Sequence, residues 1–440
     1  MTHGEPYGLD ETHEPGLRSW VESANAPGTD FPLQNLPFGV FRRKGSSEAA
    51  RVGVAIGDQV LDLHGAATAG ALARMAPGGQ VALLAPTLNP LMAQGRAASR
   101  SLRRAVHGLL RADSTRTRRD PALLVPMQDV DLLLPADIGD YTDFYASIHH
   151  ATNVGSMFRP DEPLLPNYKW VPIGYHGRAS SVVPSGSAIR RPGGQTRDDD
   201  AAAPVVGPSR ALDYECEMAA WVGQGNLLGE AVPIDRAEEH LFGLGLLNDW
   251  SARDMQRWEY QPLGPFLSKN FGTTVSPWIV TFDALEPFRV AAAARAPGDP
   301  EPLAYLDSAS NRSRGGIAVD LEVRLSSAAM RREGLPPLRV SRSSLSTIYW
   351  TLAQLLAHHT SNGCNLRPGD LLGTGTISGP EKENRGCLLE LTWRGRDPLL
   401  LPTGESRRFL EDGDAVILRG RCEREGFTGI GFGVCAGIVG

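Results

Sequence analysis

Segment 140–159 concentrates side chains that can transfer protons or bind ions. Those of most interest are Asp140, Asp143, Tyr145, the adjacent His149 and His150, and Arg159. If Asp140 caps a short helix that stops at 153–155, Asp143 and His150 are seven positions apart and share a face. A carboxylate and an imidazole would then face one space. A capping aspartate and a surface histidine would fit the same residues, so this segment alone leaves both interpretations open.

Segment 212–222 predicts a strand with three acids on one face. Because side chains alternate along a strand, Asp213, Glu215 and Glu217 lie opposite the apolar positions. Carboxylates so close together repel each other unless a cation or solvent relieves them. The strand is therefore either a solvated surface strand or part of a divalent-cation site. Oxygen ligands of this kind suit Ca²⁺, Mg²⁺ or Mn²⁺ rather than zinc.

Segment 248–260 favours the cation site, because it adds functional groups at helical spacing. Asp249, Arg253, Gln256 and Tyr260 fall at i, i+4, i+7 and i+11, so on a helix they would line one polar face. The apolar run 241–247 precedes them, which would place this face at the end of a buried strand, as in an active site. Lys269 follows as a lone lysine among mostly apolar residues in a turn-rich segment.

Composition limits the class of protein that could carry these clusters. With 440 residues, 49 glycines and 33 prolines, the chain is long enough for two domains and favours strands and turns over long helices. The net charge of -6 argues against a nucleic-acid partner. We see neither a membrane-spanning run nor a secretory signal, so we expect a cytoplasmic protein. The five cysteines are scattered, and we expect them to be reduced and buried.

The periodicity predicts a mainly β (α+β) chain in two domains, 1–134 and 135–440. We expect N-terminal strands in 38–41, 51–63, 122–126 and 130–135, and an amphipathic helix in 94–112 whose arginines form a solvated face. Further strands are predicted in 181–184, 213–222, 241–247, 278–282, 317–325, 371–377, 388–393 and 415–418. A helix is expected from about Ser344 to His359, and 290–316 reads as an exposed loop. Motifs of serine hydrolases, P-loop and Rossmann enzymes, zinc proteases and EF-hands are absent from the sequence.

Several motifs in order resemble the fumarylacetoacetate hydrolase family. They are Asp140-Tyr-Thr-Asp-Phe-Tyr with His150-Ala-Thr-Asn-Val-Gly, Gly174-Tyr-His-Gly-Arg-Ala-Ser-Ser, Asn248-Asp-Trp-Ser-Ala-Arg-Asp, Pro262-Leu-Gly-Pro-Phe, Asn365-Leu-Arg-Pro-Gly-Asp and Gly375-Thr-Ile-Ser-Gly. The resemblance extends to 35–41 and 53–58 and so covers nearly the whole chain. It implies an N-terminal SH3-like β-barrel domain, a large mixed β-roll catalytic domain, and a homodimer. It also implies hydrolysis of the carbon–carbon bond of a small β-diketo acid, 4-fumarylacetoacetate, the last step of tyrosine and phenylalanine degradation.

The resemblance also implies roles for individual residues. Four acids would hold Ca²⁺: Asp143, Glu215, Glu217 and Asp249. Lys269, through its backbone carbonyl, and Thr273 would join Asp249 at a structural Mg²⁺. The catalytic residues would be His150 as general base, Glu390 as its orienting acid, and Arg253, Gln256 and Lys269 as donors to the oxyanion. The substrate-binding positions would be Tyr145, Arg159, Tyr175, Gln256, Tyr260 and Thr376.

Two points remain open at this stage. Ile148-His149 departs from the family's pattern, and the second histidine competes with His150 for the role of base. On a helix these two histidines point about 100° apart, so both cannot face the same water. The competing functions are another enzyme of the superfamily, such as an acylpyruvate hydrolase or oxaloacetate decarboxylase, and a non-catalytic calcium-binding protein. The first is usually shorter, and the second has no use for His150, Arg253 and Lys269.

Overall fold

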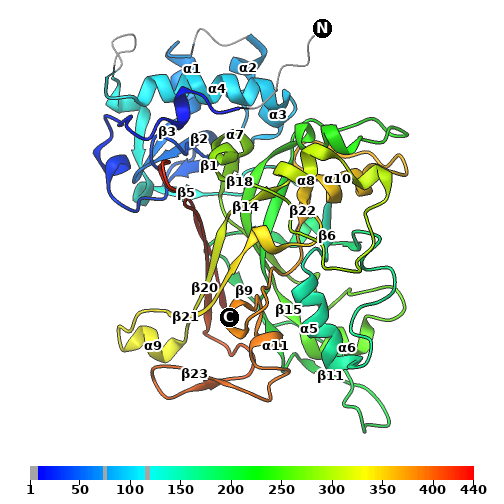
Figure 1. The fold of residues 1–440 in the computed structure, drawn as a ribbon. Helices are drawn as coiled ribbons and strands as arrows, with labels where there is room; N and C mark the ends of the chain where they lie inside the picture. Colours follow the sequence, from blue (N-terminus) through cyan, green and yellow to red (C-terminus); the bar gives the residue numbers. More distant parts are fainter. Residues whose placement is uncertain (1–7, 73–76, 114–118) are drawn as a thin grey trace.

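The computed structural model describes residues 8–72, 77–113 and 119–440, which form a mixed α and β structure (Figure 1). Ten strands form the continuous path of its largest sheet, in this spatial order: β4 (Leu124–Pro126), β3 (Gln59–Asp62), β2 (Arg51–Ile56), β1 (Phe38–Arg43), β17 (Trp278–Thr281), β14 (Leu241–Asp249), β13 (Cys216–Val222), β22 (Leu371–Gly373), β6 (Tyr141–Phe144) and β7 (Gly174–His176). Off this path, β5 (Val130–Leu132) pairs with β1, and β16 (Thr273–Val275) pairs with β14 and β8 (Val182–Pro184). The sheet therefore joins the N-terminal strands directly to those that carry the candidate site.

The expected SH3-like barrel is not closed among the described residues. The N-terminal strands pair in the open order β4-β3-β2-β1-β5. The reason lies in β1, which splits its outer edge between two partners. Phe41 to Arg43 pair with β5, whereas Phe38 and Gly39 pair with Ile279 and Trp278 of β17. The edge that would complete a barrel is thus partly used to attach the N-terminal strands to the rest of the chain.

A second sheet packs against the first. Its strands, in spatial order, are β21 (Leu338–Ser344), β20 (Asp320–Ser326), β25 (Ala415–Cys422), β26 (Ile430–Val439) and β9 (Ala188–Ile189). Apolar side chains of both sheets share one buried cluster, among them Met218 and Leu246 from the first and Val323, Leu418 and Phe432 from the second. Burial of this apolar surface, worth about 25 cal/mol per Å², fixes the strand ends that carry the functional groups.

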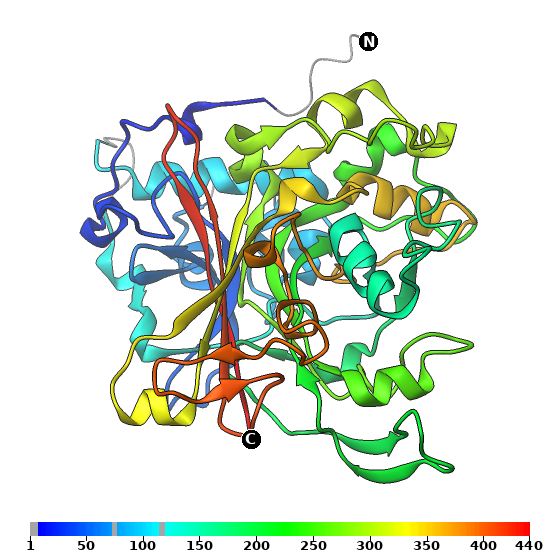
Figure 2. The same cartoon turned by 60° about the horizontal axis from the view of Figure 1, so that its bottom comes forward.

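Smaller elements complete the fold. Two-stranded sheets are formed by β10 (Gly193–Thr196) with β11 (Val205–Pro208), β12 (Leu212–Asp213) with β15 (Ser251–Ala252), β18 (Arg289–Val290) with β19 (Gly316–Ile317), and β23 (Leu399–Leu400) with β24 (Ser406–Arg407). The helices are α1 (Leu63–Thr68), α2 (Pro77–Ala82), α3 (Asn89–Met92), α4 (Gly95–Leu110), α5 (Ile148–Phe158), α6 (Arg253–Glu259), α7 (Phe282–Leu285), α8 (Ala309–Arg314), α9 (Ala328–Arg332), α10 (Leu352–Thr360) and α11 (Leu388–Leu391). Figure 2 shows the β10–β11 hairpin beside α6.

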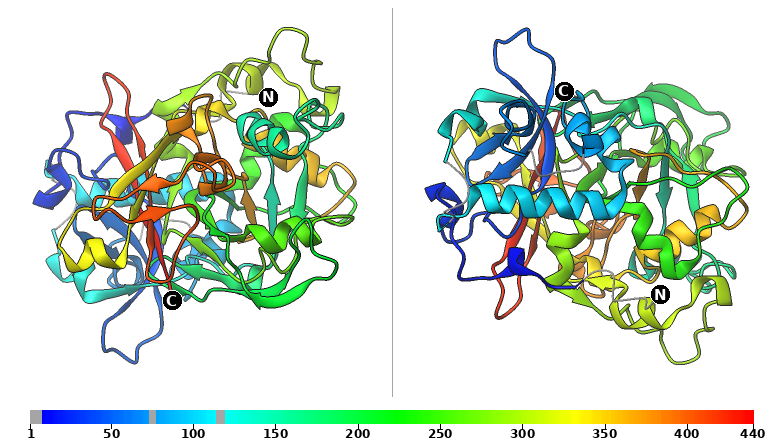
Figure 3. Two further views of the ribbon diagram at one scale, coloured as in Figure 1. Left: turned by 90° about the horizontal axis from the view of Figure 1, so that it is seen from below. Right: turned by 90° about the horizontal axis from the view of Figure 1, so that it is seen from above.

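The predicted solvated face of the basic helix is wrong for two of its arginines. The helix exists as α4, which crosses the N-terminal end of the molecule in the right-hand view of Figure 3. Arg103 is buried and donates to the carbonyls of Gln34 and Asn35. Arg96 is buried too and pairs with Asp283 and Glu286 of the C-terminal region. The sequence pattern could not reveal these partners, because they are remote in the chain.

Three other predictions of local structure are wrong in whole or in part. Segment 388–393 begins with helix α11 instead of a strand. The buried carboxylate of Asp213 accepts hydrogen bonds from the backbone N–H groups of Leu388 and Leu389, at the start of this helix. The helix expected from Ser344 starts only at Leu352, where Thr351 caps it. The exposed loop predicted for 290–316 is right only in part, since 291–303 has no helix or strand and many of its residues are exposed. The segment also contains β18, α8 and β19, and its Arg295 stacks on Tyr349 with 4.4 Å to the ring centroid.

The cysteines are all free, as expected, but Cys364 is only partly buried. In the described ranges, no helix has the length and apolar character that a membrane span requires.

Candidate active site

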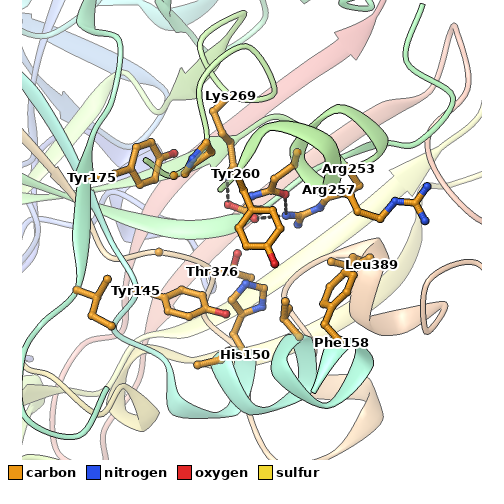
Figure 4. A pocket seen from close by; sticks show the side chains of 18 of the residues that line it. Tyr145, His150, Phe158, Tyr175, Arg253, Arg257, Tyr260, Lys269, Thr376 and Leu389 are labelled. Carbon is orange, nitrogen blue, oxygen red and sulfur yellow. Dashed lines mark hydrogen bonds and ion pairs between the residues drawn. The ribbon is translucent and has the colours of Figure 1, made fainter. Parts of the chain in front are cut away.

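A cavity of about 710 Å³ lies where α5, α6 and the ends of β6 and β7 meet (Figure 4). The figure shows Tyr145 and His150 on the α5 side and Lys269, Tyr175 and Arg253 across from them. Apolar side chains such as Phe158, Leu164 and Leu263 line the cavity together with the exposed Arg159 and Arg394. A mixed apolar and polar lining suits a small polar molecule.

The predicted helix containing Asp140 and Asp143 is wrong. Residues 141–144 form β6, because Tyr141 and Asp143 pair in parallel with Leu371 and Gly373 of β22. Helix α5 begins after Ser147, whose hydroxyl accepts from the backbone N–H of His150, and it continues past Gly155 to Phe158. Asp143 and His150 both line the cavity, but the short connection between a strand and a helix brings them there.

Four carboxylates meet at the strand ends as one buried cluster. Asp143 comes from β6, Glu217 from β13, Glu215 from the residue before β13, and Asp249 from the last position of β14, and one oxygen of each lies within 4.8 Å of the others. Because Asp249 ends a strand, the predicted helical face running from it to Tyr260 is wrong; α6 begins only at Arg253. The interpretation of 212–222 as a solvated surface strand is also excluded, since these acids are buried.

The electrostatics of this cluster favour a bound cation. Burial raises the pKa of Asp143 to about 8, with the charge of Asp249 adding to the effect. Burial also raises the pKa of Glu217 well above its usual value, and Asp143 and Glu215 add to that shift. Glu217 Oε1 and the hydroxyl of Tyr141 are buried and have no hydrogen-bond partner among the described residues. Four crowded carboxylates with an unused oxygen are a suitable donor set for a hard divalent cation.

Two basic side chains border the cluster. The ammonium of Lys269 contacts Glu215 and lies 2.8 Å from Asp249 Oδ2, while Thr273 Oγ1 donates to Asp249 Oδ1 at 2.8 Å. Arg253 Nη1 lies 2.7 Å from Glu215 Oε1 and donates to Gln256 Oε1 at 3.0 Å. Arg253 Nη2 is buried and has no partner within the described chain. Because Arg253 lines the cavity, this nitrogen is a candidate donor to a bound oxyanion.

His150 and Glu390 form a buried pair beside the carboxylate cluster. His150 Nδ1 lies 2.6 Å from Glu390 Oε2, and His150 also lines the cavity. Burial alone would raise the pKa of Glu390, but the charge and hydrogen bond of His150, together with a donor from Asn153, lower it to about 2. An ionised Glu390 accepts a hydrogen bond from Nδ1–H, which leaves Nε2 as the nitrogen that can accept a proton.

Sequence reasoning missed the residues that hold Glu390. Asn153 Nδ2 donates to Glu390 Oε1 at 2.8 Å, Ser378 Oγ donates to Oε2 at 2.8 Å, and the Cys387 thiol lies 3.1 Å from Oε2. The sequence pattern predicts a helix stop at 153–155, but α5 continues to Phe158, and Asn153 lies three residues after His150 on the same side of this helix.

The predicted substrate-binding residues all line the cavity: Tyr145, Arg159, Tyr175, Gln256, Tyr260 and Thr376. Their present contacts differ. The hydroxyl of Tyr175 donates to Asp249 Oδ2 at 3.0 Å, and Arg159 Nη2 donates to the Pro163 carbonyl at 3.2 Å. Thr376 Oγ1 is buried without a partner in the described structure, which leaves it available to a ligand.

A substitution at Gly373 tests the carboxylate cluster without removing any of the four carboxylates. A Cβ atom there would lie 2.8 Å from Asp143 Oδ1 and 3.1 Å from Glu217 Oε2, closer than these oxygens can accept without moving. We expect Gly373→Ala to weaken binding of a divalent cation, with Ca²⁺ as the probe, by about tenfold or more, since hard-cation sites depend on ligand placement. Isothermal titration calorimetry measures this change.

Gly207→Ala in β11 is the matched control, because no atom of the described residues lies within 4 Å of the Cβ it would add. Equal Ca²⁺ affinities for the two variants would contradict a cation site at the four acids.

Comparisons with known proteins extend these observations. Residues 34–135 match the family model described as "Fumarylacetoacetase N-terminal", and residues 140–437 match "Fumarylacetoacetate (FAA) hydrolase C-terminal". The chain is 50% identical over 430 residues to the fumarylacetoacetase of Oryza sativa subsp. japonica, covering 96% of this chain and 97% of that protein. It is 50% identical over 422 residues to that of Homo sapiens, covering 94% and 97% respectively.

Among solved structures, the chain resembles a fumarylacetoacetate hydrolase from Exiguobacterium antarcticum. The TM-score is 0.50 at 17% sequence identity, and the match covers 92% of this chain and 99% of that chain. At this identity the likeness concerns the fold alone.

Proposed function

This chain belongs to the fumarylacetoacetase family, and we propose that it hydrolyses 4-fumarylacetoacetate to fumarate and acetoacetate. The observation that carries the proposal is that the His150–Glu390 pair and the four-carboxylate cluster contribute residues to one cavity. A base able to activate water thus lies beside a site able to hold a diketone. This is the combination that hydrolysis of a carbon–carbon bond requires.

His150 is proposed to activate the water. With its Nδ1 proton donated to Glu390 Oε2 at 2.6 Å, the ring presents Nε2 as proton acceptor. The water loses a proton to Nε2 as its oxygen attacks the carbonyl carbon on the fumaryl side of the diketone. The positive charge that forms on the imidazole is stabilised by the ionised Glu390, whose own position is held by Asn153 and Ser378.

The tetrahedral intermediate carries its negative charge on the former carbonyl oxygen. Arg253 Nη2, which has no partner in the described structure, is proposed to donate to this oxygen, with Gln256 and Lys269 adjoining. When the carbonyl re-forms, the carbon–carbon bond breaks, and its electron pair passes to the acetoacetate fragment as an enolate. Protonation of that enolate carbon, with the proton that His150 took, completes a balanced hydrolysis.

Asp143, Glu215, Glu217 and Asp249 are proposed to hold Ca²⁺. When bound, the cation would act as a Lewis acid that holds the two diketone oxygens and stabilises the enolate. The carboxylates supply the compensating charge, and Glu217 Oε1, which no described residue contacts by a hydrogen bond, fits the role of a ligand. A structural Mg²⁺ beside Asp249, Lys269 and Thr273 is proposed from the family resemblance; the mutual contacts of these residues support only their proximity.

The remaining proposals rest on the resemblance. We propose that the protein is a cytoplasmic homodimer and that its N-terminal domain, related to an SH3-like barrel, ends near residue 134.

Substrate choice separates this proposal from other activities of the superfamily. We expect purified protein with Ca²⁺ to cleave fumarylacetoacetate with a kcat/KM at least about a hundredfold higher than an acylpyruvate, because binding both ends of the substrate contributes to transition-state stabilisation. Steady-state assays on both compounds, and on oxaloacetate, measure this ratio. A higher kcat/KM for an acylpyruvate or oxaloacetate would favour the alternative enzymes, and Ca²⁺ binding without any turnover would favour a non-catalytic protein.

A further inference from the structure

Asp213 stands apart from the other acids of its segment. The sequence pattern grouped it with Glu215 and Glu217, but the strand is interrupted after Asp213, and β13 resumes at Cys216. Asp213 is fully buried and belongs neither to the four-carboxylate cluster nor to the cavity lining. It therefore needs an explanation other than cation binding.

The carboxylate of Asp213 joins two elements that are remote in the sequence. Oδ2 accepts from Arg253 Nε at 2.9 Å and from the backbone N–H of Leu389 at 3.0 Å. Oδ1 accepts from the backbone N–H groups of Leu388 and Tyr214, each at 2.8 Å. One side chain thus contacts both the first residue of α6 and the first two residues of α11.

Each of these elements carries a group of the proposed mechanism. On the Arg253 side, Asp213 accepts a hydrogen bond from Nε, and Glu215 and Gln256 contact Nη1. These contacts fix the plane of the guanidinium and leave Nη2 without a partner among the described residues. On the α11 side, the residue after Leu389 is Glu390, the partner of His150. A guanidinium is planar, so fixing Nε and Nη1 also determines where Nη2 points.

We propose that Asp213 is a positioning residue, which holds the oxyanion donor Arg253 and the Glu390–His150 pair at a fixed separation. It contacts no substrate and acts only through these groups. The inference rests on the proposed function and deepens it. The separation matters because the attacking water and the developing oxyanion are bonded to the same carbon atom, so misplacing either group lowers the rate.

Asp414 offers a matched control. It is also fully buried, its oxygens accept from Arg407 Nε at 2.8 Å and Nη2 at 3.2 Å, and Oδ2 accepts from the backbone N–H of Glu411 at 2.9 Å. Neither Asp414 nor Arg407 lines the cavity. A purely structural buried aspartate–arginine pair should therefore respond as Asp414 does.

The experiment compares Asp213→Asn with Asp414→Asn. We expect both variants to unfold at lower denaturant concentration, but only Asp213→Asn to lose kcat, by about tenfold or more, with KM changed less than about threefold. In an Arg253→Lys background, Asp213→Asn should lower kcat by a smaller factor, because Arg253, one of the groups that Asp213 positions, is already altered. Equal kcat losses in the two single variants, or an undiminished loss in that background, would overturn the proposal.

A crystal structure of Asp213→Asn tests the positioning role without turnover. We expect displacement of the Arg253 guanidinium and of the first turn of α11. Wild-type positions for both would refute the inference even if the protein cleaves fumarylacetoacetate. Conversely, a wild-type protein that does not cleave this compound would refute the proposed function, and displacement of both groups would still support their attachment through Asp213.

Discussion

Replacing His150 with alanine is expected to lower turnover of fumarylacetoacetate by about a hundredfold or more, a loss of about 2.7 kcal/mol in transition-state stabilisation. The reason is that His150 lines the cavity and is oriented there by Glu390, which accepts from its Nδ1. Without the imidazole, the group proposed to take the proton as water attacks is missing. Steady-state kinetics with saturating Ca²⁺ measure the loss.

His149→Ala is the matched control for this variant. His149 is the adjacent residue on α5, is partly buried, and does not line the cavity. We expect its turnover to stay within about threefold of wild type, since no role in proton transfer is assigned to it. Both variants should keep wild-type Ca²⁺ affinity. If His149→Ala lost more turnover than His150→Ala, the assignment of the base would be wrong.

The second large effect is expected from Glu215→Gln. This substitution removes one negative charge from the carboxylate cluster and weakens the ion pairs of Glu215 with Lys269 and Arg253. We expect Ca²⁺ affinity to fall by about a hundredfold and turnover at limiting Ca²⁺ to fall with it, because hard-cation affinity depends on ligand charge. Calorimetric titration and turnover measured against Ca²⁺ concentration give the two values.

Glu286→Gln controls for the loss of any buried acid. Glu286 is buried, pairs with Arg314 and Arg96, and does not line the cavity. This variant should lose stability but keep its Ca²⁺ affinity. A Glu215→Gln protein that binds Ca²⁺ as tightly as Glu286→Gln would show that the cation site lies elsewhere.

Residue types and short spacings predicted much of the site. The prediction that Glu215 and Glu217 lie together holds, since both belong to the four-carboxylate cluster. The uninterrupted strand predicted for 213–222 is wrong, because β12 ends at Asp213 and β13 begins at Cys216, and Asp213 lies outside the cluster. The argument that joined Asp143 to His150 was wrong, although both residues line the cavity. The sequence offered a helix cap at Asp140, whereas β22, more than two hundred residues away, draws 141–144 into the sheet.

Long-range contacts account for the other errors. Nothing local indicates that 388–391 turns into a helix, since its first N–H groups are satisfied by Asp213. The burial of Arg103 likewise depends on carbonyls of Gln34 and Asn35. The resemblance named Glu390 as partner of His150 without any prediction of the helix that carries it. The division near residue 134 stays a prediction, because the main sheet runs across it.

The most direct test of the central claim is product analysis with one protein preparation in three states. Purified protein is incubated with fumarylacetoacetate as prepared, after exhaustive chelation, and after Ca²⁺ is restored, and the products are quantified by chromatography. We predict fumarate and acetoacetate in equal amounts, almost none after chelation, and full recovery with Ca²⁺. Cleavage that continues unchanged after chelation, or no cleavage in any state, would contradict the claim that metal-assisted hydrolysis of a carbon–carbon bond takes place in this cavity.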